Sequence, residues 1–546
     1  MSRTLVTNAR IFTANRAADG DEWAEALVIE GGTLAYVGDV ATATRTAGDD
    51  AERIDLGGRL VVPGFLDVHT HLHMLGDALG RVQLRDARSL GEIQARLAAA
   101  RDAAPEAPRL LGVSWLFDSV PGGAPTRQMI DEVVADRPVY LDANDLHSTW
   151  VNTAGLAELG ITRDTPDPIG GRIGRDADGE PDGMLYETAT QFFVWRFLAE
   201  QTTDADRDAA AERAIDAYLA TGVTGAADMA FGERELASIE RVAAKRGGLP
   251  FEFVAYWIVD NTGDEAQNLA QVARAAELAE RTGQGDSPVR IVGIKLITDG
   301  VIDACTAAMN EPYADGTNEE PIWPYEHMAP VVAAADAAGL QIALHAIGDA
   351  ASSSALDALE HAIAVNGEPE GRPRRHRVEH LEYASPGTAE RMARLGVTAS
   401  MQPVHCDPAI MDNWIARLGD DRADRGFAWA EYRDAGALLA FSTDAPTAPH
   451  QALPNLYIAA TRRSALDPAL DALSPQYALP LGDAVGHATR DAAASIREEH
   501  LRGRLADGLA ADFAVLDADP FTGGDAVLLE ARVIRTVVGG RTVYEG

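Results

Sequence analysis

Residues 61–71 have the sequence VVPGFLDVHTH, an apolar run that ends in two histidines separated by one threonine. Seven further apolar runs follow it, and Ala-rich stretches with helical spacing lie between them. This alternation is typical of parallel strands joined by crossover helices. Eight such strands close a (β/α)8 TIM barrel, the α/β fold that the sequence predicts. The seven later runs are residues 222–230, 251–259, 289–297, 340–349, 376–383, 396–405 and 437–446.

The segments outside these runs predict two further parts. Short strand-like runs with Gly-rich turns fill residues 1–62 and 500–546, and we expect both ends to pair into one small β-sandwich. Two separate β units are the alternative. Residues 63–499 then form the barrel domain. Its stretch from about 74 to 215 is too long for one crossover and contains strand-like runs of its own. We therefore expect an α/β insertion after barrel strand 1 that shapes the substrate pocket.

Charge and cysteine content exclude several classes of function. The 546 residues carry a formal charge of −37, which repels nucleic acid and anionic lipid. No apolar run approaches the length of a membrane span, and the N-terminus lacks the apolar part of a signal peptide. Two cysteines far apart, Cys305 and Cys406, favour structural roles in a reducing cytoplasm. We expect a cytoplasmic protein with no nucleic-acid or membrane partner; a homodimer is compatible with the sequence.

Residues that can bind a metal recur where the barrel strands end, on the face where barrel active sites lie. His69 and His71 are two positions apart, so on a strand both imidazoles face the same way. Later strands end near a lysine, two histidines and an aspartate. A set of this kind at so many strand ends predicts a metal centre. Its members are His69, His71, Lys295, His345, His380 and Asp444.

Lys295 is unusual because only two of the 47 basic residues are lysines, the other being Lys245. An ammonium cannot bind a metal, but a neutral amine can add carbon dioxide and become an anionic carbamate, which two nearby cations would stabilise. Arginine cannot do this because it stays protonated. We therefore expect a carbamate on Lys295; a lysine that extends to solvent is the alternative. Such ligands suit zinc best, although manganese, iron, nickel and cobalt also fit.

Several stretches between residue 61 and about residue 449 resemble the amidohydrolase superfamily, in particular its YtcJ-like branch, which includes the N-substituted formamide deformylases. They include VVPGFLDVHTHLHMLG, DRPVYLDANDLHSTWVN, GIKLITDGVIDACTAAMNEPYADG, LHAIGDAA, RHRVEHLEYASP and FSTDAP. The resemblance implies a binuclear metal centre. One divalent ion would be held by His69, His71 and Asp444. The second would be held by His345 and His380, with carboxylated Lys295 as the bridge.

The resemblance also implies a metal-dependent hydrolase. We expect it to cleave a C–N bond other than a peptide bond, in an N-substituted amide or formamide, by attack of metal-activated hydroxide. Asp444 is expected to pass the proton to the departing amine, and His147 to polarise the carbonyl. Deamination, hydrolysis of a cyclic amide or amidine, and carboxyester hydrolysis need the same residues and stay open. A binding protein on an inactive barrel is the alternative outside enzymes.

Four residues of the expected insertion are candidates for substrate contact: Trp115, Phe117, Tyr186 and Glu187. Aromatic side chains there would bind an apolar N-substituent, although such residues more often fill a core. His405, just beyond the seventh strand, is a further candidate contact. His73 continues the two-residue spacing of His69 and His71, and we expect it to line the pocket or to pack nearby.

Overall fold

The computed structural model describes residues 3–16, 20, 22–144, 148–168, 171–187, 189–284, 287–367 and 373–546. The chain divides into two compact units. The first comprises residues 1–72 and 215–546, and the second comprises residues 73–214. Among the described residues, no helix combines the length and the apolarity that a membrane span requires.

An eight-stranded parallel sheet of the first unit forms a nearly closed barrel, which confirms the predicted TIM barrel. Each apolar run predicted from the sequence overlaps one of its strands, and neighbours in the sheet are neighbours in this series. The strands are β6 (Phe65–Thr70), β13 (Val223–Phe231), β14 (Glu252–Ile258), β15 (Arg290–Ile297), β16 (Gln341–Ala346), β17 (Arg377–His380), β18 (Thr398–Met401) and β19 (Leu439–Phe441).

Hydrogen bonds just beyond β19 join the last strand of the barrel to the first. The backbone N–H of Asp444 donates to the carbonyl oxygen of His69 at 2.7 Å. The buried Asp67 of β6 accepts hydrogen bonds from the backbone N–H and the hydroxyl of Thr443. These bonds bring the histidines at the end of β6 beside Asp444, although most of the chain separates them.

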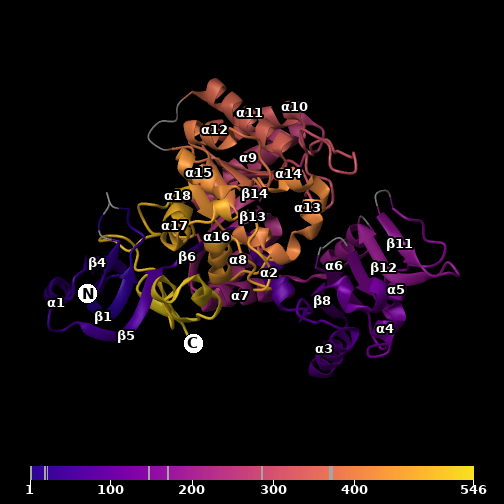
Figure 1. Cartoon of the computed structure of the whole chain (residues 1–546), viewed down its shortest axis with the longest axis horizontal. Coiled ribbons are helices and arrows are strands. Elements are labelled where there is room, and N and C mark those ends of the chain that lie inside the picture. Colours follow the sequence, from indigo (N-terminus) through magenta and orange to yellow (C-terminus); the bar gives the residue numbers. More distant parts are fainter. Residues whose placement is uncertain are drawn as a thin grey trace. The chain divides into compact units, whose positions relative to one another are not determined.

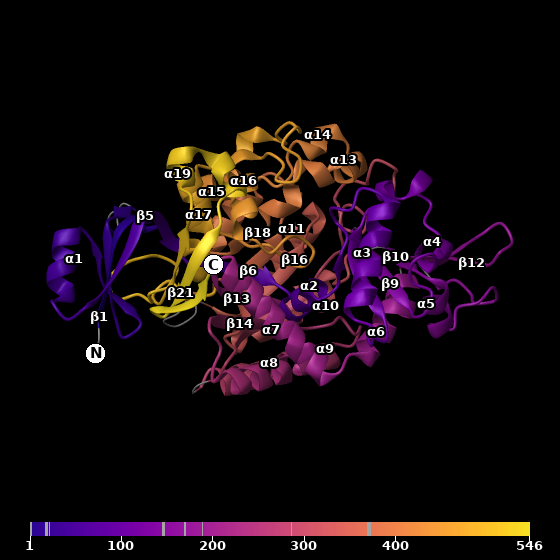
Figure 2. The same cartoon turned by 90° about the horizontal axis from the view of Figure 1, so that it is seen from below.

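Helices lie outside the barrel strands in both views (Figures 1 and 2). In α8 (Glu233–Arg246) the buried residues Leu236, Ile239 and Val242 recur at helical spacing. This helix ends at Gly247, whose φ of 74° is the left-handed conformation typical of helix C-termini. The other outer helices include α9 (Glu265–Thr282), α10 (Tyr325–Ala337), α11 (Asp349–Asn366), α12 (Thr388–Leu395), α15 (Trp429–Ala435) and α17 (Leu481–His487).

Strands from both chain ends pair in a second sheet of the first unit. β5 (Glu52–Pro63) pairs in parallel with β1 (Arg3–Phe12) and antiparallel with β20 (Phe513–Leu516). The sheet order is β22-β21-β20-β5-β1-β3-β4, with β2 beside β1. That this sheet forms a sandwich stays a prediction. Its remaining strands are β2 (Trp23–Ala24), β3 (Ala26–Glu30), β4 (Thr33–Gly38), β21 (Val533–Val538) and β22 (Arg541–Glu545).

The second unit has a sheet of its own, in the order β11-β12-β10-β9-β8-β7. Trp115, Leu141 and Trp150 belong to its buried apolar core. That this unit shapes the substrate pocket stays a prediction. Its strands are β7 (Val82–Gln83), β8 (Leu110–Trp115), β9 (Val139–Ala143), β10 (Ser148–Val151), β11 (Gly171–Arg175) and β12 (Pro181–Glu187), and its helices include α3 (Leu90–Ala103), α4 (Arg127–Asp131), α5 (Thr153–Glu158) and α6 (Arg196–Gln201).

Candidate metal centre

The six residues predicted as metal ligands lie near the carboxyl ends of barrel strands. Parallel strands of one barrel end on the same face, so residues far apart in the sequence meet there. Four of the six are on strands: His69 on β6, Lys295 on β15, His345 on β16 and His380 on β17. His71 follows β6, and Asp444 follows β19.

His69, His380 and Asp444 form the tightest group. One ligand atom from each lies within 4.8 Å of the other two, and all three residues are buried. His380 and Asp444 have φ angles of 76° and 57°, a left-handed region that is unfavourable for residues other than glycine. Strain of this kind concentrates at functional sites. The backbone thus holds two side chains in the cluster at an energetic cost.

His71 brings a fourth side chain to this group. The Nε2 atoms of His71 and His69 lie 3.1 and 3.4 Å from Oδ1 of Asp444. This buried oxygen nevertheless accepts no well-aligned hydrogen bond from any described residue. Two imidazole nitrogens and a carboxylate oxygen that converge in this way fit the donor set of a divalent cation such as zinc.

Lys295 lies in the same cluster and is 2% exposed. Its Nζ atom is 3.2 Å from Nε2 of His69. Burial lowers the pKa of the Lys295 ammonium, against the opposing charges of Glu379 and Asp444. An amine in this environment loses its proton more readily than an exposed one. The alternative of a lysine that extends to solvent is therefore wrong.

Three of the histidines are neutral near pH 7. Burial, together with the charge of Lys295, lowers the pKa of His69 to about 4 and that of His345 to about 3. Burial and the neighbouring histidines lower the pKa of His380 well below its usual value. Neutral imidazole is the form that binds metals, so these side chains need lose no proton to act as ligands.

Two of these histidines are oriented by partners that are not among the residues predicted from the sequence. Nδ1 of His69 lies 2.7 Å from Oε2 of Glu379, and Nδ1 of His380 lies 2.9 Å from Oε1 of Gln402. Each contact leaves Nε2 directed to the cluster, as in metal sites where an outer hydrogen bond fixes the histidine tautomer. One signal pointed to Glu379: the buried strand β17 carries Arg377 and Glu379 two positions apart, and buried charges need partners.

His345 lies beside His380, with ring centroids 4.4 Å apart. Its Nε2 atom is 3.2 Å from the carbonyl oxygen of Gly300 and 3.5 Å from Oδ1 of Asp299. Asp299 in turn accepts hydrogen bonds from the backbone N–H groups just beyond β16. Burial raises the pKa of Asp299 to about 7. With Nε2 occupied in this way, Nδ1 of His345 is the nitrogen available to a metal.

His405 lies next to Asp444, as its position after the seventh strand suggested. Its ring stacks on His380 at a centroid distance of 6.0 Å, and Nε2 is 3.8 Å from Oδ2 of Asp444. Burial would lower the pKa of His405, but the carboxylates of Glu382 and Asp444 outweigh this and raise it. His405 thus stands beside the expected acid–base residue; its contact with substrate stays a prediction.

The residues predicted in the insertion make contacts within the second unit. The indole of the buried Trp115 donates to the carbonyl oxygen of Leu141 at 2.9 Å, and Phe117 packs on it at 4.5 Å between centroids. The guanidinium of Arg172 lies 3.7 Å from the ring centre of Tyr186. Trp115 is therefore a core residue of its unit. With 0% of its surface exposed, Trp115 has no face for a substrate, whereas contact by Phe117 and Tyr186 stays a prediction.

Two predicted residues have no described side chain. His147, the expected carbonyl donor, lies outside the described residues. Glu187 ends β12, but its side chain also lies outside the described part. Their assignments as catalytic residue and substrate contact stay predictions.

His73 is not on the same strand as His69, so the two-residue spacing of these histidines does not place their side chains on one face. β6 ends at Thr70, and α2 (Leu72–Leu79) begins two residues later, so His73 lies on a helix. The two cysteines are free, and burial raises the pKa of the Cys406 thiol to about 11. A thiol with such a pKa is a poor nucleophile at neutral pH, in agreement with a structural role.

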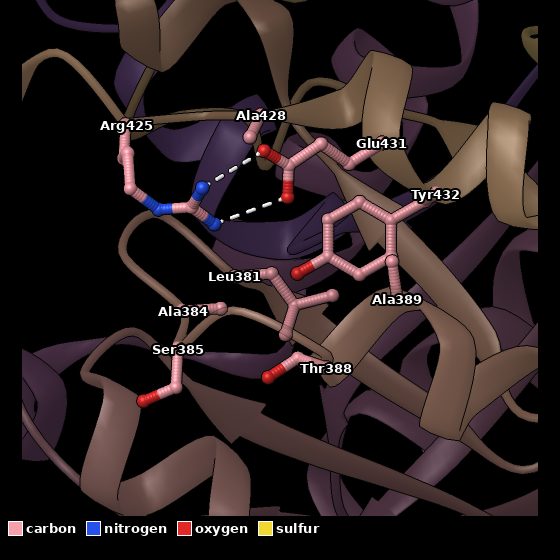
Figure 3. Close-up of a pocket in the computed structure, with 9 residues that line it drawn as sticks. All are labelled: Leu381, Ala384, Ser385, Thr388, Ala389, Arg425, Ala428, Glu431 and Tyr432. Atoms are coloured by element: carbon pink, nitrogen blue, oxygen red, sulfur yellow. Dashed lines mark hydrogen bonds and ion pairs between the residues drawn. The ribbon is translucent and has the colours of Figure 1, made fainter.

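A small cavity beside the end of β17 does not include the expected ligands (Figure 3). Its lining includes Leu381 and the ion pair of Arg425 with Glu431, whose two contacts measure 3.0 and 3.1 Å. Its volume of ≈ 10 Å³ is the room of about one water molecule. The cavity is too small for a substrate, so the strand-end cluster is the candidate functional site.

Known proteins are similar to this chain in sequence and in architecture. A family model described as "Amidohydrolase family" matches residues 52–544. The "Putative amidohydrolase YtcJ" of Bacillus subtilis is 30% identical, over 98% of both chains. The "N-substituted formamide deformylase" of Arthrobacter pascens is 26% identical, over 100% of this chain and 99% of its own. An uncharacterized metal-dependent hydrolase from Pyrococcus horikoshii has a similar structure, with a TM-score of 0.76 and 26% identity over 96% of this chain and 99% of that one.

The family match covers both the barrel and the strand-end cluster. Its extent, and the length over which the relatives align, agree with the resemblance found in the sequence motifs. The chain therefore belongs to the amidohydrolase family.

Proposed function

We propose that this protein hydrolyses a C–N bond, other than a peptide bond, in a small N-substituted amide or formamide. The convergence of His69, His380 and Asp444 within 4.8 Å, with Lys295 beside them, is the observation that carries this proposal. The choice of substrate class is supported by the 26% identity to a protein named N-substituted formamide deformylase, over the whole length of both chains.

The donor set fits two divalent ions, with zinc the preferred metal. His69, His71 and Asp444 would hold one ion, and His345 and His380 the other. Lys295, carboxylated on Nζ, would contribute a ligand oxygen to each. Ions of this kind, when bound, acidify a water molecule and polarise a carbonyl oxygen. The neutral imidazoles of His69 and His345 support this assignment, and so does the lowered pKa of the buried Lys295 amine.

Asp444 is the proposed acid–base residue. The imidazoles of His69 and His71 outweigh the effect of burial and lower the pKa of Asp444, so its carboxylate is ionised at neutral pH. It can take a proton from the attacking water as the O–C bond forms. When the C–N bond breaks, it returns that proton to the departing amine nitrogen. The products are a carboxylic acid and an amine.

Other residues complete the proposed site. His147 would donate to the substrate carbonyl oxygen, and His405 would contact the substrate beside Asp444. Phe117, Tyr186 and Glu187 would contact the N-substituent, and the buried Trp115 would support Phe117. We place the enzyme in a reducing cytoplasm, consistent with free cysteines at 305 and 406, and propose a homodimer that sedimentation can test.

A substrate panel tests the reaction type. Purified protein supplied with zinc is incubated with N-substituted formamides, larger N-substituted amides, cyclic amides, amidines and carboxyesters, and the acid, amine and ammonia released are measured. We expect amine and acid in equal amounts from the N-substituted amides. Ammonia from a ring would instead indicate a deaminase, and turnover of esters alone an esterase. A protein that binds no metal and turns over no member of the panel would contradict the proposal.

A further inference from the structure

A buried ion pair lies directly behind His69. Arg377 and Glu379, two positions apart on β17, both have fully buried side chains. The guanidinium contacts both carboxylate oxygens: Nε to Oε1 at 2.5 Å, and Nη2 to Oε2 at 3.1 Å. Oε2 is also the atom 2.7 Å from Nδ1 of His69. One carboxylate thus joins a barrel arginine to a candidate metal ligand.

Arg377 is itself fixed in place. Its Nη2 donates to the carbonyl oxygen of Val68 at 2.9 Å and to Oγ of Ser400 at 2.7 Å. These contacts tie the guanidinium to β6 and β18, the strands that carry Val68 and Ser400. A buried ion pair is costly unless its hydrogen bonds are satisfied, and here they are. The carboxylate of Glu379 therefore has little freedom to turn away from His69.

We propose that Arg377 and Glu379 are positioning residues for His69, and that they set the affinity for one of the two ions. Glu379 accepts the Nδ1 proton of His69, which leaves the Nε2 lone pair for the metal. Arg377 keeps Glu379 negative and fixes its two oxygens. This inference rests on the metal centre of the proposed function. Neither Arg377 nor Glu379 is a proposed metal ligand; their proposed role is to orient one.

Glu379→Gln separates this task from simple packing because glutamine has nearly the same shape. Arg377 and His69 together direct N–H groups at both oxygens of Glu379, whereas a glutamine side chain offers only one oxygen. If that oxygen turns to Arg377, the amide NH2 faces Nδ1 of His69. His69 must then carry its proton on Nε2 and cannot donate a lone pair to the ion.

The test is a metal titration of protein first stripped with a chelator. Zinc or cobalt is added against a coloured competing chelator, which gives the two binding constants separately. We expect Glu379→Gln to weaken one constant about 10- to 100-fold, the usual effect of losing an outer hydrogen bond to a ligand. The other constant, set by His345 and His380, should be unchanged. The unfolding midpoint of the stripped protein is measured alongside, because loss of the charge beside the buried Arg377 is expected to lower it, and the binding constants are compared at a temperature at which the variant is folded.

Ser400→Ala is the matched control. It removes one buried partner of Arg377 but leaves the contact of Glu379 with His69, so we expect both binding constants to match those of the wild type. Gln402→Leu provides the converse variant, since Gln402 contacts His380; we expect it to weaken the other constant. If Glu379→Gln does not fold, Glu379→Asp retains the charge beside Arg377 but is too short to reach His69, and the same selective loss is expected.

The outcomes separate two failures. Wild-type protein that binds no ion would overturn the proposed function together with this inference. Wild-type protein that binds two ions, with both constants unchanged in a folded Glu379 variant, would overturn the inference alone. An equal loss in the Glu379 and Ser400 variants would also overturn it, because packing would then explain the effect.

Discussion

The neutral histidines predict that the metal-free protein loses stability steeply in mild acid. The ordinary pKa of histidine is about 6.5, and in the folded protein burial and Lys295 lower the pKa of His345 to about 3. Between pH 7 and pH 5 the unfolded chain therefore binds a proton at this residue that the folded chain does not. Stability that is present above pH 6.5 is lost as the pH falls. Linkage gives a decrease of about 2 kcal/mol in the free energy of unfolding for this residue alone.

Denaturant unfolding of stripped protein at pH 7, 6 and 5 measures this effect. His345→Asn removes the titrating ring, so its loss of stability between pH 7 and pH 5 should be about 2 kcal/mol smaller than that of the wild type. The exposed His361 on α11 supplies the control for removing an imidazole, and His361→Asn should keep the wild-type difference. Equal pH dependence in the wild type and in His345→Asn would refute the conclusion that His345 is held neutral.

Three further substitutions test individual residues. Asp444→Asn should keep much of the metal but lower turnover at least about 10²-fold, because an amide can ligate through oxygen but cannot shuttle a proton; near-normal kcat would assign proton transfer to another residue such as His405. Lys295→Arg should lower turnover as much as Lys295→Ala, since it puts a permanent cation into the cluster, and acetate or formate should partly restore turnover only in the alanine variant. Lys245→Arg is the control. Normal turnover of Lys295→Arg would exclude the carbamate. Asp67→Asn should lower the unfolding midpoint by weakening the contact between Asp67 and Thr443 at the barrel closure, and an unchanged midpoint would show that this contact is dispensable.

The barrel could be predicted from the sequence because strand and helix periodicities alternate along it. The run at residues 61–71 shows the limit of such a pattern. It is continuous in sequence, yet Val61 to Pro63 belong to β5 of the terminal sheet and Phe65 begins β6 of the barrel. Gly64 lies between them, where a β-carbon would come within 2.2 Å of Thr224. Apolarity alone does not show where a chain leaves one sheet for another.

That these residues would lie together could be predicted because their chemistry is unusual at strand ends, as with a lysine in a chain that has two. Their role as metal ligands stays a prediction. Glu379 and Gln402 could not be predicted, because their partners lie on other strands. Glu379 contacts His69 across the barrel face, and the two are 310 positions apart. No local spacing connects them. Only the closure of the barrel turns a charged pair on β17 into a support for a histidine on β6.

Anomalous diffraction from crystals grown with zinc, recorded at the zinc edge, tests the metal centre most directly. We expect two peaks at the carboxyl end of the barrel, one bounded by His69, His71 and Asp444 and the other by His345 and His380. Density for a carboxyl group on Nζ of Lys295 should lie between them. Well-ordered crystals that show no peak at these side chains, or zinc bound only elsewhere, would contradict the assignment of this cluster as the catalytic metal centre.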